Sequence, residues 1–418
     1  MKKCYSTANI LLPDFKKTDA QKWAVIACDQ FTSEPEYWED VSRIIGDAPS
    51  TLDLFLPEVY LSEASERLPK IHKQMKNHLE NILIPYENAM MSVERTLSDG
   101  SVRNGLILAL DLECYDYAKG STALTRASEK TVLERLPPRV AIRRQADIEL
   151  PHTMIFIDDP DKKVIEPLEN AKTEYLYDTD LMKGGGHIRG RLLTEEEKAQ
   201  VSKALDELVT PEAMLKRYGD ASLAPMLFAV GDGNHSLASA KAFYEELKMN
   251  IGDEAKDHPA RYALCEIVNI HDEAIKFEPI YRVMFGVDPY DVLNSLKEYA
   301  NTLDGTEEAQ GTLVISKDFE EIVGFAKPRH QLTVGTLESF IKGYLKTHAD
   351  ASCDYIHGEN SVRTLSAKEN TIGFLFEGIH KEQFFPTVIR EGSLPKKTFS
   401  MGHAEDKRYY LEARKIKN

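Results

Sequence analysis

The chain has 418 residues, of which 42% are hydrophobic and 29% charged, a composition typical of a folded globular protein. Its formal net charge of −16 argues against sequence-independent nucleic-acid binding, which needs a basic face. No window approaches the roughly 20 apolar residues of a membrane-spanning helix. The five cysteines are scattered without a Cys-x-x-Cys pair, which favours a reducing compartment. We therefore expect a cytoplasmic protein without membrane or nucleic-acid partners, while the oligomeric state stays open.

The first hundred residues alternate strand-like and helix-like patterns. Residues 23–27 are predicted to form a strand, and 34–45 a helix with Pro35 in its first turn. A long amphipathic helix is expected over 61–83. Residues 91–97 and 102–112 are predicted to pair as strands around Ser98-Asp99-Gly100, a hairpin signal.

A basic segment follows at 126–144, where six basic residues face two acidic ones in an otherwise acidic chain. Guanidinium groups suit phosphate because their forked donors match paired oxygens. Leu136-Pro-Pro-Arg139 is predicted to be a rigid extended piece that holds Arg139 in place. We expect Arg126 and Arg139 to serve an anion site, although surface arginines that pair with nearby acids are the alternative.

Next along the chain, residues 154–157 are predicted to form a buried strand between His152 and the pair Asp158-Asp159. Paired carboxylates can bind magnesium, but Asp-Asp-Pro is also good turn chemistry, and we favour the turn. His152 is a candidate base, although without a visible partner a structural histidine is the simpler interpretation.

The stretch Lys183-Gly-Gly-Gly-His187-Ile-Arg189 combines exposed backbone amides with positive charge. It lacks the Gly-Lys-Ser/Thr ending of a P-loop and the glycine spacing of a dinucleotide-binding fold. An anion-binding flap charged by Lys183, Arg189 and Arg191, with His187 as a further candidate, is one interpretation, and a hairpin tip is the other. Thr194-x-x-Glu197 then forms a capping box that opens a helix.

Residues 226–236 are the most informative segment. An apolar run over 226–230 predicts a buried strand, which stops at the turn Gly231-Asp232-Gly233. Asn234 is a plausible N-cap for the Ala-rich helix expected over 237–247. Asp232 and His235 should therefore lie where a strand ends and a helix begins. Backbone amides and the helix dipole favour an anion there, and Ser236 belongs to the same turn.

In the last third, helices are predicted from Asp288 to about residue 303 and over 336–346. Residues 362–365 and 371–376 are expected to pair as a terminal hairpin. The polar stretch 304–311 is either a loop or a domain connection. We predict an α+β fold with a mixed sheet, divided into a main domain over 1–303 and a C-terminal portion over 304–418, or else a single domain.

Several motifs together carry a family resemblance over nearly the whole chain. They are Leu136-Pro-Pro-Arg139, Glu149-Leu-Pro-His152, Ile157-Asp-Asp-Pro160, Gly231-Asp-Gly-Asn-His235 and the tail 394–403. This set resembles the domain of unknown function 1015, a family of bacteria and archaea. The family has no settled reaction, so the resemblance names no activity.

The Asp-Gly-x-His element before an Ala-containing helix is similar to the ParB/sulfiredoxin-like superfamily, which includes nucleotide-binding partition proteins, sulfiredoxins and free-serine kinases. The resemblance implies a ParB/sulfiredoxin-like core with large insertions, in which the loop and helix start contact nucleotide phosphates. Many members have an Arg where this chain has Ser236, so Arg126, Arg139 or Arg189 would have to replace it. Asn234 stands where sulfiredoxin chemistry needs a cysteine, which excludes that activity.

These observations lead to the hypothesis of a protein that binds a nucleotide or phosphorylated metabolite, with a small-molecule kinase as its most concrete form. Asp232 would be the base or a magnesium ligand and His235 would contact the transferring phosphoryl group. Amides at Gly231, Gly233 and Asn234 would hold the phosphates of ATP or ADP with Mg²⁺. The alternative is a non-catalytic module in which nucleotide binding switches a protein contact.

The C-terminal tail is the last candidate. Phe399 and Met401 are two residues apart, as a strand needs to bury both on one face. We predict that residues 395–401 are ordered and pack against the core, with Lys397 or His403 near the site. A frayed terminus is the alternative.

Overall fold

The computed structural model describes residues 3–170, 172–409 and 411–418. The chain forms two compact units, one from the N-terminal residues up to Ile275 together with Gly402–Asn418, the other from Lys276–Met401. The division falls at Ile275 and not at residue 303, because the helix over 289–302 packs against the sheet of the second unit. Residues 402–418 belong to the first unit again, and no pattern in the sequence predicts this.

The described helices of the first unit are α1 (Ala20–Trp23), α2 (Pro35–Ile45), α3 (Ala64–Asn81), α4 (Leu136–Gln145), α5 (Glu195–Glu207), α6 (Pro211–Tyr218) and α7 (Asn234–Ile251). Its strands are β1 (Tyr5–Ser6), β2 (Ala8–Pro13), β3 (Leu83–Ala89), β4 (Met91–Thr96), β5 (Val102–Asp111), β6 (Tyr115–Asp116), β7 (Thr125–Ala127), β8 (Ile148–Glu149), β9 (Met154–Ile157), β10 (Tyr177–Asp180), β11 (His187–Leu192), β12 (Phe228–Asp232), β13 (Tyr262–Asn269) and β20 (Arg414–Lys415).

A mixed sheet organises this unit. Its order is β10-β11-β4-β5-β13-β9-β12-β7-β6, with β1 beside β5. The β13–β9, β12–β7 and β6–β7 pairs are parallel, and the other pairs are antiparallel. The mixed α+β class predicted from the sequence is therefore confirmed.

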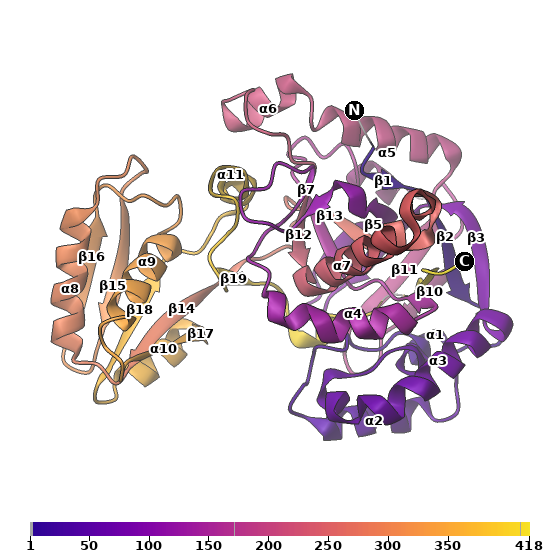
Figure 1. The fold of residues 1–418 in the computed structure, drawn as a ribbon, viewed down its shortest axis with the longest axis horizontal. Helices are drawn as coiled ribbons and strands as arrows, with labels where there is room; N and C mark the ends of the chain where they lie inside the picture. Colours follow the sequence, from indigo (N-terminus) through magenta and orange to yellow (C-terminus); the bar gives the residue numbers. More distant parts are fainter. Residues whose placement is uncertain (1–2, 171, 410) are drawn as a thin grey trace. The chain divides into compact units, whose positions relative to one another are not determined.

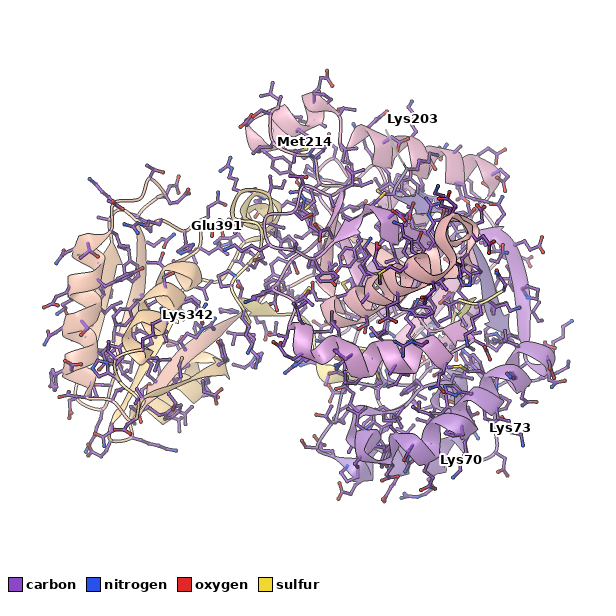
Figure 2. All side chains as sticks on the ribbon, viewed as in Figure 1. Lys70, Lys73, Lys203, Met214, Lys342 and Glu391 are labelled. Atoms are coloured by element: carbon purple, nitrogen blue, oxygen red, sulfur yellow. The ribbon has the colours of Figure 1, made fainter. Side chains whose placement is uncertain are left out.

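The sheet has a hydrophobic core on each of its two faces. Successive side chains of a strand point to opposite faces, so a strand that is buried on both faces contributes side chains to both cores. On β5, Leu106, Leu108 and Leu110 pack with the apolar faces of α5 and α7. Ile107 and Ala109 point to the other face, toward β2, β3 and α3. Helices α4 and α7 pack side by side (Figure 1). Lys70 and Lys73 on α3 and Lys203 on α5 project outward from their helices (Figure 2).

The second unit holds helices α8 (Pro289–Thr302), α9 (Thr333–Leu345), α10 (Glu359–Ser366) and α11 (Lys381–Glu391) among its described elements. Its strands are β14 (Glu278–Phe285), β15 (Gln310–Ile315), β16 (Glu320–Phe325), β17 (Ser352–His357), β18 (Thr371–Phe376) and β19 (Phe399–Ser400). They form an antiparallel sheet in the order β16-β15-β18-β14-β17, with β19 beside β14. No described helix of either unit is long and apolar enough to cross a bilayer.

Most predicted elements are present. The helix with Pro35 in its first turn is α2, the long amphipathic helix is α3, and the hairpin around Ser98-Asp99-Gly100 joins β4 to β5. Thr194 and Glu197 form both hydrogen bonds of the capping box at the start of α5. The tail prediction is confirmed in part: Phe399 is buried and pairs across to Pro279 of β14, but Met401 is only half-buried, and the segment belongs to the second unit.

Three local predictions are wrong. Residues 23–27 do not form a strand, because α1 runs to Trp23 and only Ile26 makes an isolated bridge. Leu136-Pro-Pro-Arg139 is the first turn of α4, where prolines cost no hydrogen bond. Residues 362–365 belong to α10, while β18 pairs with β14 and β15 instead.

Glu412 is a fully buried carboxyl group whose ionisation should oppose folding. Its Oε1 accepts a hydrogen bond from the Tyr177 hydroxyl at 2.6 Å. Burial raises the pKa of Glu412 to about 7 from 4.5. Because the folded state binds this proton more tightly than the unfolded state, stability falls as the pH rises from about 4.5 to 7, and the penalty persists above 7.

Glu412→Gln keeps the acceptor for Tyr177 and removes the charge. We expect the variant to be more stable than the wild type by about 1–3 kcal/mol at pH 8 and nearly equal to it at pH 5. Urea unfolding at both pH values measures this. The exposed Glu80→Gln on α3 is the matched control and should show no such pH dependence. An equal effect of Glu412→Gln at both pH values would contradict the argument.

Candidate functional site

A polar cavity of about 560 Å³ lies in the first unit, at the junction of β12 and α7. Four segments of the chain line it: the loop after α1, the 3-10 turn η2 (Glu58–Glu63), the segment that leads into α4, and the β12–α7 turn. Its charged and polar lining residues are Asp29, Thr32, Glu58, Glu129, Lys130, Arg135, Arg139, Asp232, Asn234, His235 and Ser236.

The β12–α7 turn is as tight as its glycines suggest, but Gly233 has the role that the sequence assigned to Asn234. Gly233 is the N-cap, with φ of 83°, and Asn234 is the first helical residue. A Cβ on Gly233 would lie 2.9 Å from Thr153 Oγ1 and 3.1 Å from Thr153 Cα. Gly231 lies in β12, against the ring of Phe156. The glycines are thus required by packing against the β9 segment.

Asp232 is held by two partners. Its Oδ1 accepts a hydrogen bond from the Gly233 amide at 2.8 Å, so this amide is not available to a phosphate. Its Oδ2 pairs with Lys407 Nζ at 3.2 Å. Burial disfavours the Lys407 ammonium, but Asp232 outweighs it and raises the pKa of Lys407. Lys407 is one of the residues here that the sequence did not single out, and Asp29, Glu58 and Arg135 are others.

His235 lies in the first turn of α7, and its ring is fixed by a backbone contact. The Val132 amide donates to His235 Nε2 at 3.4 Å, which places the proton of the neutral ring on Nδ1. Burial, together with Arg139 and Arg135, lowers the pKa of His235. The ring is therefore neutral at pH 7 and keeps one N–H donor. Ser236 Oγ hydrogen-bonds with His152 Nε2 at 2.8 Å, which gives His152 the partner that the sequence did not show.

Of the basic segment, Arg139 reaches the cavity and Arg126 does not. Arg139 pairs with Glu58 and donates to the Arg135 carbonyl at 3.0 Å, while Arg135 and Lys130 line the same cavity from exposed positions. The guanidinium of the buried Arg126 donates hydrogen bonds to the backbone carbonyls of Ala123, Ala224 and Pro225. Arg126 therefore ties loops together, and this placement does not favour a phosphate ligand for it.

The glycine-rich stretch between β10 and β11 does not line the polar cavity. Arg189 pairs with Glu94 at 2.7 Å, and Lys183 pairs with Asp40. A Cβ on Gly185 would overlap the guanidinium of Arg408, so close packing explains this glycine without an anion. The hairpin-tip interpretation is the one that the structure supports.

The remaining candidates also lie outside the cavity lining. His187 sits between Asp178 and Asp180 at 2.6 and 2.8 Å, and these carboxylates outweigh burial and raise the pKa of His187. His403 is exposed before a short 3-10 turn. Lys397 belongs to the second unit, where its ammonium lies over the Tyr355 ring.

Other chemistries find less support in this cavity. Burial and the nearby Asp29 raise the pKa of Cys28 to about 12, so its sulfur is a thiol and a poor nucleophile. The favoured turn at Asp158-Asp159 is present: Asp159 accepts the amides of Lys163 and Val164, and Asp158 pairs with Arg217. Within the described residues, no cluster of three or more metal-ligating side chains occurs.

Comparison with known protein families places the chain. A model of the family described as "Protein of unknown function (DUF1015)" matches residues 12–417. The chain belongs to this family. The resemblance inferred from the sequence motifs is thereby confirmed. A search of curated proteins finds no match.

Solved structures show only a distant likeness. A conserved hypothetical protein from Pyrococcus furiosus aligns with a TM-score of 0.35 at 10% identity, over 75% of this chain and 95% of that one. A mutant free serine kinase in complex with ADP gives 0.36 at 10% identity, over 76% and 93%. Free serine kinase in complex with AMP gives 0.36 at 11% identity, over 75% and 91%. Scores this low support no conclusion about the activity of this chain.

The close approach at Gly233 makes a stability prediction. Gly233→Ala places a Cβ against Thr153 in the left-handed region, whereas Gly219→Ala at the end of α6 has a similar left-handed backbone but nothing within 4 Å. Both variants carry the strain of positive φ, about 1 kcal/mol, and only Gly233→Ala adds a clash that costs about 1–3 kcal/mol more. Urea unfolding of both variants measures the difference. Equal losses would show that Thr153 gives way.

Proposed function

We propose that the polar cavity binds the phosphate groups of a nucleotide or another phosphorylated small molecule. The observation that supports this is the first turn of α7, which no side chain caps and which opens into a cavity lined by Lys130, Arg135 and Arg139. Free amides at a helix start and the positive end of the helix dipole favour an anion. Arg139 replaces the guanidinium that the chain lacks at Ser236.

The mixed charge of the cavity favours a metal–nucleotide over a bare anion. Asp29, Glu58, Glu129 and Asp232 line it together with the three cations, of which Arg139 pairs with Glu58. Mg²⁺ in nucleotide sites needs only one or two protein carboxylates, because phosphate oxygens and water complete its coordination. One of these carboxylates, Asp232 in this proposal, would hold Mg²⁺, which neutralises phosphate charge when it is bound.

In its most concrete form the proposal is a phosphotransferase that acts on a small hydroxylated metabolite. The acceptor oxygen bonds to the γ-phosphorus while the bond from that phosphorus to the bridging oxygen breaks, and ADP leaves. Asp232 accepts the acceptor's proton or holds Mg²⁺, and His235 donates from Nδ1 to a phosphoryl oxygen. Arg135 and Arg139 neutralise the charge that develops. A neutral His235, as its lowered pKa provides, is the form suited to this donor role.

Nucleotide binding tests the proposal first. Arg135→Ala should weaken the binding of ADP with Mg²⁺ about 10- to 100-fold, because a charge-assisted contact is lost. Arg144→Ala removes an arginine of α4 that pairs with Glu246 outside the cavity, and it should bind as the wild type does. Isothermal titration of the three proteins measures this. Equal affinities, or no heat with the wild type, would contradict a phosphate site here.

Turnover separates an enzyme from a regulatory module. We expect the wild type to release ADP from ATP with a pool of hydroxylated metabolites, and Asp232→Asn to lower that rate about 100-fold or more, since positioning and charge carry phosphoryl transfer. Melting curves with ADP check that both proteins are folded. Nucleotide that raises the melting temperature without any turnover would instead establish a non-catalytic binding module.

A further inference from the structure

A second cavity, of about 390 Å³, adjoins the polar one in the first unit. Its walls are mainly aliphatic and come from the segment before η2, from α3, from α4 and from the β8 region. Representative lining residues are Leu54, Leu68, Ile71, Met75, Ile142 and Ile148. Folded interiors are close-packed, and an apolar void forfeits contacts along its whole lining. A cavity of this size falls in the range of small-molecule sites.

The two cavities share part of their walls. Six residues line both of them: Cys28, Glu58, Leu61, Arg135, Arg139 and Ser236. Leu61 lies at this border and is 43% exposed. A molecule in the apolar cavity would therefore have one end beside Ser236 and the entrance to the polar cavity.

Three residues of this lining also carry a buried nitrogen atom without a hydrogen-bond partner in the described part of the chain. His72 Nε2, Arg143 Nε and His152 Nδ1 are buried and have no hydrogen-bond partner among the described residues. All three residues line this cavity. A buried nitrogen without a partner costs about 1–3 kcal/mol. The hydrogen-bonded pair of His152 and Ser236 is a polar part of this lining, so the cavity favours an occupant that is largely hydrocarbon but carries oxygen at that end.

We propose that this cavity binds an amphipathic small molecule, with its hydrocarbon body among α3 and α4 and an oxygen substituent at the His152–Ser236 pair. The site thus selects a medium-length aliphatic alcohol or hydroxy compound over a small polar metabolite. In one respect the inference rests on the proposed function: the bound hydroxyl is the acceptor only if the polar cavity holds the phosphoryl donor. The binding itself does not depend on nucleotide.

The straight-chain alcohols from 1-butanol to 1-octanol are the probe, titrated without nucleotide and followed by calorimetry or ligand-observed NMR. Affinity should rise about fourfold per added methylene until the cavity is filled. Ile142→Trp fills the cavity from α4 and should weaken 1-octanol binding at least tenfold. Ala141→Trp adds the same ring at the neighbouring exposed position, outside both cavities, and should have no effect. His152→Phe should remove any preference for 1-hexanol over 1-chlorohexane.

The outcomes separate this inference from the proposed function. Alcohols that bind with this length dependence, in a protein that shows no affinity for ADP with Mg²⁺, would overturn the nucleotide site and leave the amphipathic site standing. ADP that binds, with alcohols that do not or that bind equally to Ile142→Trp and the wild type, would overturn the inference alone. Melting temperatures of Ile142→Trp and Ala141→Trp show whether each variant is folded.

Discussion

The return of the C-terminal segment into the first unit is the constraint on which the site depends. Leu411, Ala413 and Ile416 are fully buried in the same core as β2 and β3. Arg414 fixes this segment to Glu149 at 2.8 Å, and Lys407 reaches Asp232 at the β12–α7 turn. The wall of the apolar cavity, which includes Tyr409 and Ile416, is therefore complete only when the C-terminal segment has folded onto the first unit.

Burial gives that segment its unusual electrostatics. The pKa of Glu149 is lowered even though burial opposes its charge, because Arg414 and Arg143 both lie against it. Glu412 accepts a hydrogen bond from the neutral Tyr177 hydroxyl, and burial raises its pKa instead. Two carboxyl groups of one core thus differ in charge state through their neighbours alone. The raised pKa of Glu412 costs the fold stability as the pH rises from about 4.5 to 7.

In the polar cavity, too, neighbouring charges determine the role of each charged side chain, but fewer of these side chains form ion pairs. Arg139 and Asp232 each have a partner of opposite charge, while Lys130 and Arg135 remain exposed on its wall. An ion pair holds a charged side chain in one orientation, which suits it to position a ligand. An exposed charged side chain can move, which suits it to neutralise the charge of a ligand. The walls of the adjoining aliphatic cavity limit the size and shape of a molecule that fits there, which charged side chains alone do not do.

The sequence by itself determined the features that depend on neighbouring residues. The capping box at Thr194, the hairpin at Ser98-Asp99-Gly100 and the strand-to-helix turn before His235 all follow from local hydrogen bonds and backbone preferences. The family also followed, because its motifs are contiguous. A local pattern gives a wrong prediction where it fits two different structures. Leu136-Pro-Pro-Arg139 suits an extended segment or the first turn of a helix, and packing against α7 favours the helix.

Tertiary structure decided everything that joins distant segments. Whether Arg126 or Arg139 reaches the β12–α7 turn depended on which one found carbonyl partners in the interior, and no spacing in the sequence encodes that choice. Lys407 lies 175 residues beyond Asp232, and His152 finds Ser236 across 84 residues. A cavity is likewise a property of packed surfaces, because its walls come from segments whose proximity is set by the burial of other residues.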